Sequence, residues 1–340
     1  MSKDFTTSYG GILENATDYP KTVEGLTDLF LYIKSRGGGV LSPITVSNYV
    51  NKLVKLNKVV TGKDYNGNLE WINDPKNVIE KIDTHIKASK KDFITPVIRL
   101  LKYSNSSNDT IAAYQKGLAG FKALEDVDRK QNKSSAKEQS RALPLKTIQA
   151  KIKDFHPEND AELVQKVLAS FYFLNDNFTP RNDLYEMKLV SDSKKMNKMD
   201  PNFNYIVINK LGEALKIIMN NYKTRHTYGR VMFDLSPELK EILDTYLHTY
   251  RKMAGDYLFV MRDGSPFKEA NFRNLIESSM EHIVGTPINI GLARKLKISD
   301  YFSSAKPHTI AQDEAFAKSF LHSTGVQKEY LKVDLFDKDD

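Results

Sequence analysis

The sequence predicts a mainly α-helical protein with a small antiparallel β-sheet, divided into two domains. Up to residue 125, apolar residues recur at helical spacing, whereas after residue 184 short apolar runs alternate with turn residues. Between these regions, residues 126–145 are mostly charged or small and have no apolar face. At 340 residues the chain is long enough for two hydrophobic cores.

The N-terminal part is predicted to form an arm followed by a helical domain. Residues 1–21 are rich in Ser, Thr and Gly, and we expect a flexible arm there. Ser42-Pro43 and Asp74-Pro75 each place a capping side chain before a proline, which is typical of a helix start. Helices are predicted to begin near Thr22, Ser42, Asp74, Ile94 and Thr110. Residues 22–125 are therefore expected to form an all-helical domain.

The C-terminal part mixes helices with short strands. Residues 126–145 are predicted to be a basic linker, and a second domain of helices and a small sheet is expected over residues 146–332. Strands are predicted at residues 184–190, 204–209, 215–220 and 230–235. Ser236-Pro237 starts another predicted helix, and residues 333–340 form an acidic C-terminal tail.

Composition and motifs exclude several kinds of protein. The net charge of +7 favours a polyanionic partner, and the absence of cysteine excludes disulfides and thiolate metal sites. No apolar run approaches the roughly 20 residues of a membrane helix, and the first residues lack a signal-peptide core, so we expect an intracellular protein without membrane contact. The histidines show no metal-ligand spacing, and no phosphate-binding or dinucleotide-binding glycine motif occurs. We therefore expect no metal and no cofactor.

Four side chains in three short sequence motifs have the chemistry needed to bind and attack a phosphate group. Arg181 lies in Phe-Thr-Pro-Arg-Asn-Asp-Leu-Tyr, and Arg294 ends Asn-Ile-Gly-Leu-Ala-Arg. The phrase Ala-Lys-Ser-Phe-Leu-His-Ser-Thr-Gly-Val-Gln-Lys-Glu-Tyr contains His322 and ends at Tyr330. Arginine guanidinium groups bind phosphate oxygens in pairs, and a phenolic oxygen can attack phosphorus.

These motifs resemble the active-site motifs of the tyrosine recombinases, also called phage-integrase-like enzymes. The likeness is greatest to forms carried by large DNA viruses, virophages and related eukaryotic mobile elements, and it covers the C-terminal half best. The resemblance implies an N-terminal helical domain that clamps DNA and an α+β catalytic domain. It also implies that DNA is cut and rejoined through a 3′-phosphotyrosyl intermediate, without metal or ATP.

The resemblance assigns a role to each candidate residue. Tyr330 would be the nucleophile, Arg181 and Arg294 would hold the nonbridging phosphate oxygens, and His322 would bind the phosphate or move a proton. The family's general acid is a lysine on a β-hairpin turn. The matching positions are Lys223 as the first choice, with Lys210 and Lys216 as alternatives.

Two positions depart from the family pattern or leave it open. Many members place His or Lys three residues before the second arginine, where this chain has Gly291. His226 or Lys295 could take over that task. Either Asp183 or Glu186 could orient Arg181 by an ion pair, and the spacing does not choose between them.

The resemblance also implies partners. Double-stranded DNA would be the substrate, bound as a homotetramer on two duplexes, with a monomer or weak oligomer off DNA. The protein would act where its target DNA is, in a host nucleus or a cytoplasmic viral compartment. The tail, through Leu335 and Phe336, could dock on a neighbouring protomer. The alternatives are a type IB topoisomerase-like enzyme, a catalytically degenerate DNA-binding protein and, more distantly, a metal-dependent integrase.

Overall fold

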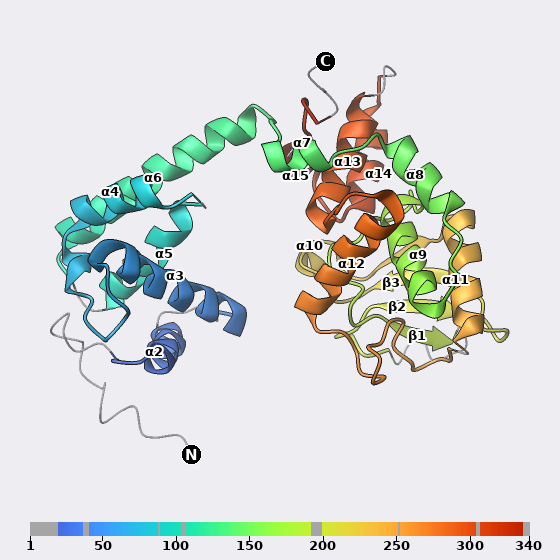
Figure 1. Ribbon diagram of the computed structural model, residues 1–340, viewed down its shortest axis with the longest axis horizontal. Coiled ribbons are helices and arrows are strands. Elements are labelled where there is room, and N and C mark those ends of the chain that lie inside the picture. The colour runs from blue at the N-terminus through green and yellow to red at the C-terminus, as the bar shows by residue number, and fades with distance from the viewer. Residues whose placement is uncertain are drawn as a thin grey trace. The chain divides into compact units, whose positions relative to one another are not determined.

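The computed structural model is mainly helical with one four-stranded sheet (Figure 1). It describes residues 20–36, 41–87, 89–103, 106–191, 199–250, 252–303 and 307–335. The chain divides into two compact units, Met1–Asp128 and Arg129–Asp340. Over the described ranges, no helix combines the length and the apolar character needed to cross a membrane.

In the described residues of the first unit, every element is a helix, as the apolar periodicity predicts. Its elements are α2 (Val23–Arg36), α3 (Pro43–Thr61), the 3₁₀ turn η1 (Glu70–Asn73), α4 (Pro75–His85), α5 (Lys91–Tyr103) and α6 (Asn108–Lys130). Both predicted capping devices are confirmed, because Ser42 accepts a bond from the Thr45 amide and Asp74 accepts one from the Asn77 amide. Most of the expected arm lies outside the described residues, although the carbonyl of Pro20 accepts a 2.7 Å bond from the Tyr65 hydroxyl.

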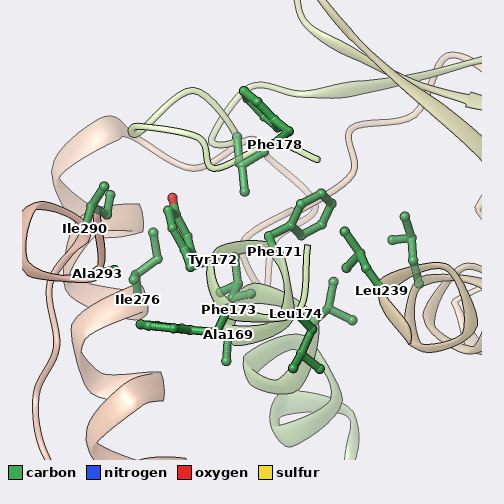
Figure 2. Close-up of a cluster of buried hydrophobic side chains, with 14 of the residues drawn as sticks. Ala169, Phe171, Tyr172, Phe173, Leu174, Phe178, Leu239, Ile276, Ile290 and Ala293 are labelled. Atoms are coloured by element: carbon green, nitrogen blue, oxygen red, sulfur yellow. The ribbon is translucent and has the colours of Figure 1, made fainter. Parts of the chain in front are cut away.

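The second unit is built around α9 (Asp160–Phe173), which is buried over its whole C-terminal half. Such a helix must be covered on every side. Figure 2 shows Phe171, Tyr172 and Phe173 of α9 among side chains from several other elements. The other helices are α7 (Ala136–Arg141), α8 (Leu145–Asp154), α10 (Arg225–Tyr228), α11 (Pro237–Thr249), α12 (Glu269–Val284), α13 (Ile290–Ser303), α14 (Ile310–Ser319) and α15 (Thr324–Tyr330).

The sheet of this unit is mixed, so the expectation of a purely antiparallel sheet is wrong. Its strands are β1 (Lys188–Ser191), β2 (Tyr205–Ile208), β3 (Ala214–Met219) and β4 (Val231–Asp234), paired in that order. β1 runs parallel to β2, whereas β2–β3 and β3–β4 are antiparallel. The segment between β1 and β2 is too long for a hairpin turn, and a long connection permits a parallel pair. The first strand also begins later than predicted, because residues 183–186 form a turn.

The stretch predicted as a linker holds much secondary structure. It contains the end of α6 and all of α7, whose first turn is closed by a capping box between Ser135 and Glu138. Arg141 of α7 donates to Glu277 at 2.6 Å, and Ala142 is buried in the core of the second unit. The hydrogen bond of Arg141 and the burial of Ala142 hold α7 against the rest of that unit.

The described part of the C-terminal tail packs on its own chain. Asp334 accepts bonds from the amide and hydroxyl of Ser134, at 2.7 and 2.8 Å. Leu335 is 3% exposed and belongs to the core of the second unit. Phe336, to which we gave a docking role, lies outside the described residues.

Candidate active site

Arg294 is a buried guanidinium near the start of α13. The helix is capped by Asn289, whose side-chain oxygen accepts a bond from the Leu292 amide. Arg294 is 2% exposed and donates from Nη1 to the Thr179 carbonyl at 2.7 Å and from Nη2 to the Phe320 carbonyl at 2.9 Å. Burial, and then the nearby charge of Arg181, lowers the pKa of Arg294 to about 10. The group therefore stays protonated at neutral pH.

His322 is held by the turn that ends α14. The His322 amide donates to the Ala317 carbonyl, and the Leu321 amide donates to the Lys318 carbonyl. This pair of bonds is a Schellman motif, in which the residue at the Leu321 position is usually glycine. Leu321 adopts the left-handed conformation there, with φ of 54°, and its side chain is buried. The turn aims the imidazole at Arg294.

The protonation state of His322 follows from its contacts. Its Nε2 lies 2.7 Å from Nη2 of Arg294, which can only donate, so Nε2 accepts and the ring proton is on Nδ1. Burial, followed by the charges of Arg294, Arg181 and Lys223, lowers the pKa of His322 to about 3. The ring is therefore neutral at pH 7. Its Nδ1–H is buried without a hydrogen-bond partner among the described residues.

Tyr330 is the last residue of α15, and its ring lies tilted against the ring of the same histidine. Ser323 caps this helix by accepting a bond from the Val326 amide. The Tyr330 ring lies 4.8 Å from the His322 ring, and the guanidinium carbon of Arg294 lies 5.7 Å from the Tyr330 ring centre. The ring is half-buried. Three of the five candidate residues therefore form one contact cluster.

Arg181 approaches this cluster from the connection between α9 and β1. The Tyr172 hydroxyl of α9 donates to the Arg181 carbonyl at 2.7 Å, and the Arg181 amide donates to the Asp183 carboxylate at 3.0 Å. Asp183 thus fixes the backbone of Arg181 instead of forming the side-chain ion pair that we considered. Burial raises the pKa of Asp183. Nη1 of Arg181 is buried without a hydrogen-bond partner in the described part of the chain.

Lys223 shares an open pocket with Arg181. The pocket has a volume of about 400 Å³ and includes Glu186 and Glu269 in its wall. Lys223 lies on the connection between β3 and β4, where the Thr224 hydroxyl donates to the Leu321 carbonyl at 3.0 Å. That bond ties the lysine's loop to the turn before His322.

The two alternative lysines lie elsewhere. Lys216 is on β3 and pairs with Asp234 at 3.9 Å, and Lys210 lines a separate pocket beside His248. Neither lysine lines the pocket of Arg181. The geometry therefore favours Lys223 among the three candidates.

Gly291 is exposed in the first turn of α13, and the two proposed substitutes differ in availability. Lys295 binds Glu138 of α7 in an ion pair, so its ammonium group is engaged away from the cluster. His226 is exposed on α10, close in sequence to Lys223. Of the two, His226 is the one not already held by a salt bridge among the described residues.

Several donors in the cluster have no hydrogen-bond partner among the described residues. They are Nη1 of Arg181, Nε of Arg294, Nδ1 of His322 and the hydroxyl of Thr179. Buried donors are normally satisfied, and a concentration of them on cationic and neutral groups suits a bound oxyanion. The sequence did not single out three further residues. The Thr179 carbonyl accepts a bond from Arg294, and the Tyr172 hydroxyl donates to the Arg181 carbonyl. Lys297 donates to the Asn175 carbonyl, in the segment that leads to Arg181.

Comparisons with known proteins give little further guidance. No family model matches the chain, and no curated protein matches it. Among solved structures, the crystal structure of XerA recombinase aligns over 94% of this chain and 95% of that chain, with 13% identity and a TM-score of 0.35. These values are too low to assign a fold or a family. The expected closeness to viral and mobile-element forms stays a prediction, and the functional argument rests on the side chains.

Proposed function

We propose that this protein cuts and rejoins DNA through a covalent tyrosine intermediate, as a site-specific recombinase or integrase. The observation that carries the proposal is the contact cluster of Arg294, His322 and Tyr330, with the charge of Arg181 close enough to lower the pKa of two members. A phenol beside buried cations, with unpaired donors around them, has the parts needed for attack on a phosphodiester.

Each residue has a role in the proposed reaction. The Tyr330 oxygen forms a bond to phosphorus while the bond from phosphorus to the 5′-oxygen breaks, and the phenol proton is lost to solvent. Arg181 and Arg294 stabilise the doubly negative transition state, and His322 donates from Nδ1 to a phosphate oxygen. Lys223 gives a proton to the leaving 5′-oxygen. Attack by the 5′-hydroxyl of a second strand reverses these steps and rejoins the DNA.

A nicked duplex that loses a short fragment after cleavage tests the proposal, because the covalent adduct then accumulates. We expect wild-type protein to form a protein–DNA adduct in EDTA, Tyr330→Phe to form none, and Tyr250→Phe, a control at another half-buried tyrosine, to behave as wild type. Substrates should carry sequence from the region flanking the gene.

The rivals give different outcomes in related assays. DNA binding without any adduct would identify a catalytically degenerate binding protein, for which the exposed Gly291 at the usual His or Lys position is the favouring observation. Relaxation of supercoiled plasmid that lacks a specific site would identify a type IB topoisomerase-like enzyme. Strand transfer that stops in EDTA would identify metal-dependent chemistry.

A further inference from the structure

Two cations of α13 bind the same connection between α9 and β1. Arg294 donates to the Thr179 carbonyl at 2.7 Å, and Lys297, one helical turn later, donates to the Asn175 carbonyl at 2.8 Å. Lys297 is 4% exposed, and its ammonium nitrogen lies 3.5 Å from a carboxylate oxygen of Asp176. The connection is therefore held at two points by side chains from one face of one helix.

A charged lysine side chain is energetically unfavourable at this buried position. Burial, partly offset by the charge of Asp176, lowers the pKa of Lys297 to about 8, which shows how unfavourable the charged form is there. An apolar side chain of similar length would fill the space without that desolvation. Packing of α13 alone does not explain the ammonium group, whereas its bond to Asn175 does.

The connection that Lys297 holds leads directly to the site. Thr179, in its middle, receives Arg294 on its carbonyl, and its own amide donates to the Ser319 carbonyl at the end of α14 at 2.9 Å. Arg181 follows two residues later. A shift of this segment would move Arg181 and would also release one bond of Arg294.

We propose that Lys297 is a positioning residue for the reaction: by fastening Asn175 to α13, it sets the place of Arg181 relative to Arg294. Lys297 does not itself touch the substrate. The predicted effect on rate rests on the proposed function. Whether Lys297 fixes the connection between α9 and β1 can be measured without any enzymatic activity.

The rate test compares Lys297→Met with Lys151→Met. Lys151 is the matched control, because it also donates to a backbone carbonyl, that of Val284 at 2.8 Å, in the same unit. On the nicked duplex in excess protein, Lys297→Met slows adduct formation about tenfold, the effect of losing one charge-assisted hydrogen bond, and leaves duplex affinity unchanged. Lys151→Met matches wild type in both. Equal rates for Lys297→Met and wild type would overturn the proposal, as would a loss of affinity that accounts for the slowing.

The second readout is hydrogen exchange of the backbone amides in residues 174–183. Exchange is faster in Lys297→Met than in wild type and unchanged in Lys151→Met; unchanged exchange in Lys297→Met overturns the proposal. If wild type forms no adduct, the proposed function fails, and exchange alone decides whether Lys297 holds the connection. Should Lys297→Met not fold, Asp176→Asn replaces it, because that side chain is 83% exposed. A smaller slowing with faster exchange is then expected, and no change in either contradicts the proposal.

Discussion

Leu321 combines backbone strain with core packing at a single residue. Its φ of 54° lies in the left-handed region, where a side chain costs about 1 kcal/mol relative to glycine, yet its side chain is 2% exposed. This strain is tolerated because the turn that orients His322 also buries the leucine side chain in the core. The sequence alone does not mark this turn, because leucine stands where a glycine would signal the left-handed conformation.

Leu321→Gly and Leu321→Ala separate the two effects. Both variants lose the buried side chain and are destabilised, by about 2–4 kcal/mol. Because glycine relieves the strain, Leu321→Gly should be about 1 kcal/mol more stable than Leu321→Ala in denaturant unfolding. Leu296, 0% exposed within α13, is the control, where glycine should be the worse replacement. The same order at both positions would contradict strain at Leu321.

The low pKa of His322 predicts a pH dependence of stability. The folded-state pKa of about 3 lies below the unfolded value near 6.5, so the unfolded chain binds more protons between these values. The stabilisation is fully present above pH 6.5 and is lost as pH falls toward 3. We expect the free energy of unfolding to fall between pH 7 and 5, and to fall less in His322→Asn. His156→Asn, a change at an exposed histidine, should keep the wild-type slope; an equal slope in His322→Asn would contradict the neutral ring.

At the level of elements, α7 is bound to the second unit by side chains. Arg141 donates to Glu277 at 2.6 Å and to the Pro287 carbonyl at 3.1 Å, and Glu138 pairs with Lys295. The Arg141 side chain is 22% exposed, so solvent screens this pair less than a surface pair.

Arg141→Met should therefore lower the free energy of unfolding by about 1–2 kcal/mol, because one partly buried charged acceptor loses its donor. Arg273→Met breaks a more exposed pair with Glu269 on α12 and should cost no more than about 0.5 kcal/mol. Chemical denaturation of both variants measures the difference. Equal effects would mean that α7 is not held by Arg141.

Local signals predicted the helices better than the sheet. Ser42-Pro43, Asp74-Pro75 and Ser236-Pro237 act within one turn, so the sequence places their helices closely. The parallel pairing of β1 with β2 depends on the path of a long connection, which carries no local pattern. The charged stretch around α7 looked like a linker because its partners, Glu277 and Lys295, are far away in the sequence.

The same distinction applies to the candidate site. Arg181, Arg294, His322 and Tyr330 were named from short phrases, and the structure brings them together; their catalytic roles stay predictions. Lys297 was missed because it is one lysine among many. The only local signal was its place between Leu296 and Ile298, one turn after Arg294.

For the whole molecule, the net charge of +7 and the cationic site predict salt-sensitive DNA binding. Each phosphate contact releases counterions, so about four contacts would weaken binding about a hundredfold between about 50 and 200 mM salt. Fluorescence anisotropy with a labelled duplex measures this, and circular dichroism at both salt concentrations confirms that the fold is unchanged. A flat response would contradict a phosphate-binding surface.

The most direct test of the central claim is to map the covalent bond itself. Adduct trapped on the nicked duplex is digested with nuclease and trypsin, which cuts after Lys328 and Lys332, and the peptides are analysed by mass spectrometry. The account predicts a nucleotide on Tyr330 within residues 329–332, bound through its 3′-phosphate. A nucleotide on any other residue, or an adduct that persists in Tyr330→Phe, would contradict it.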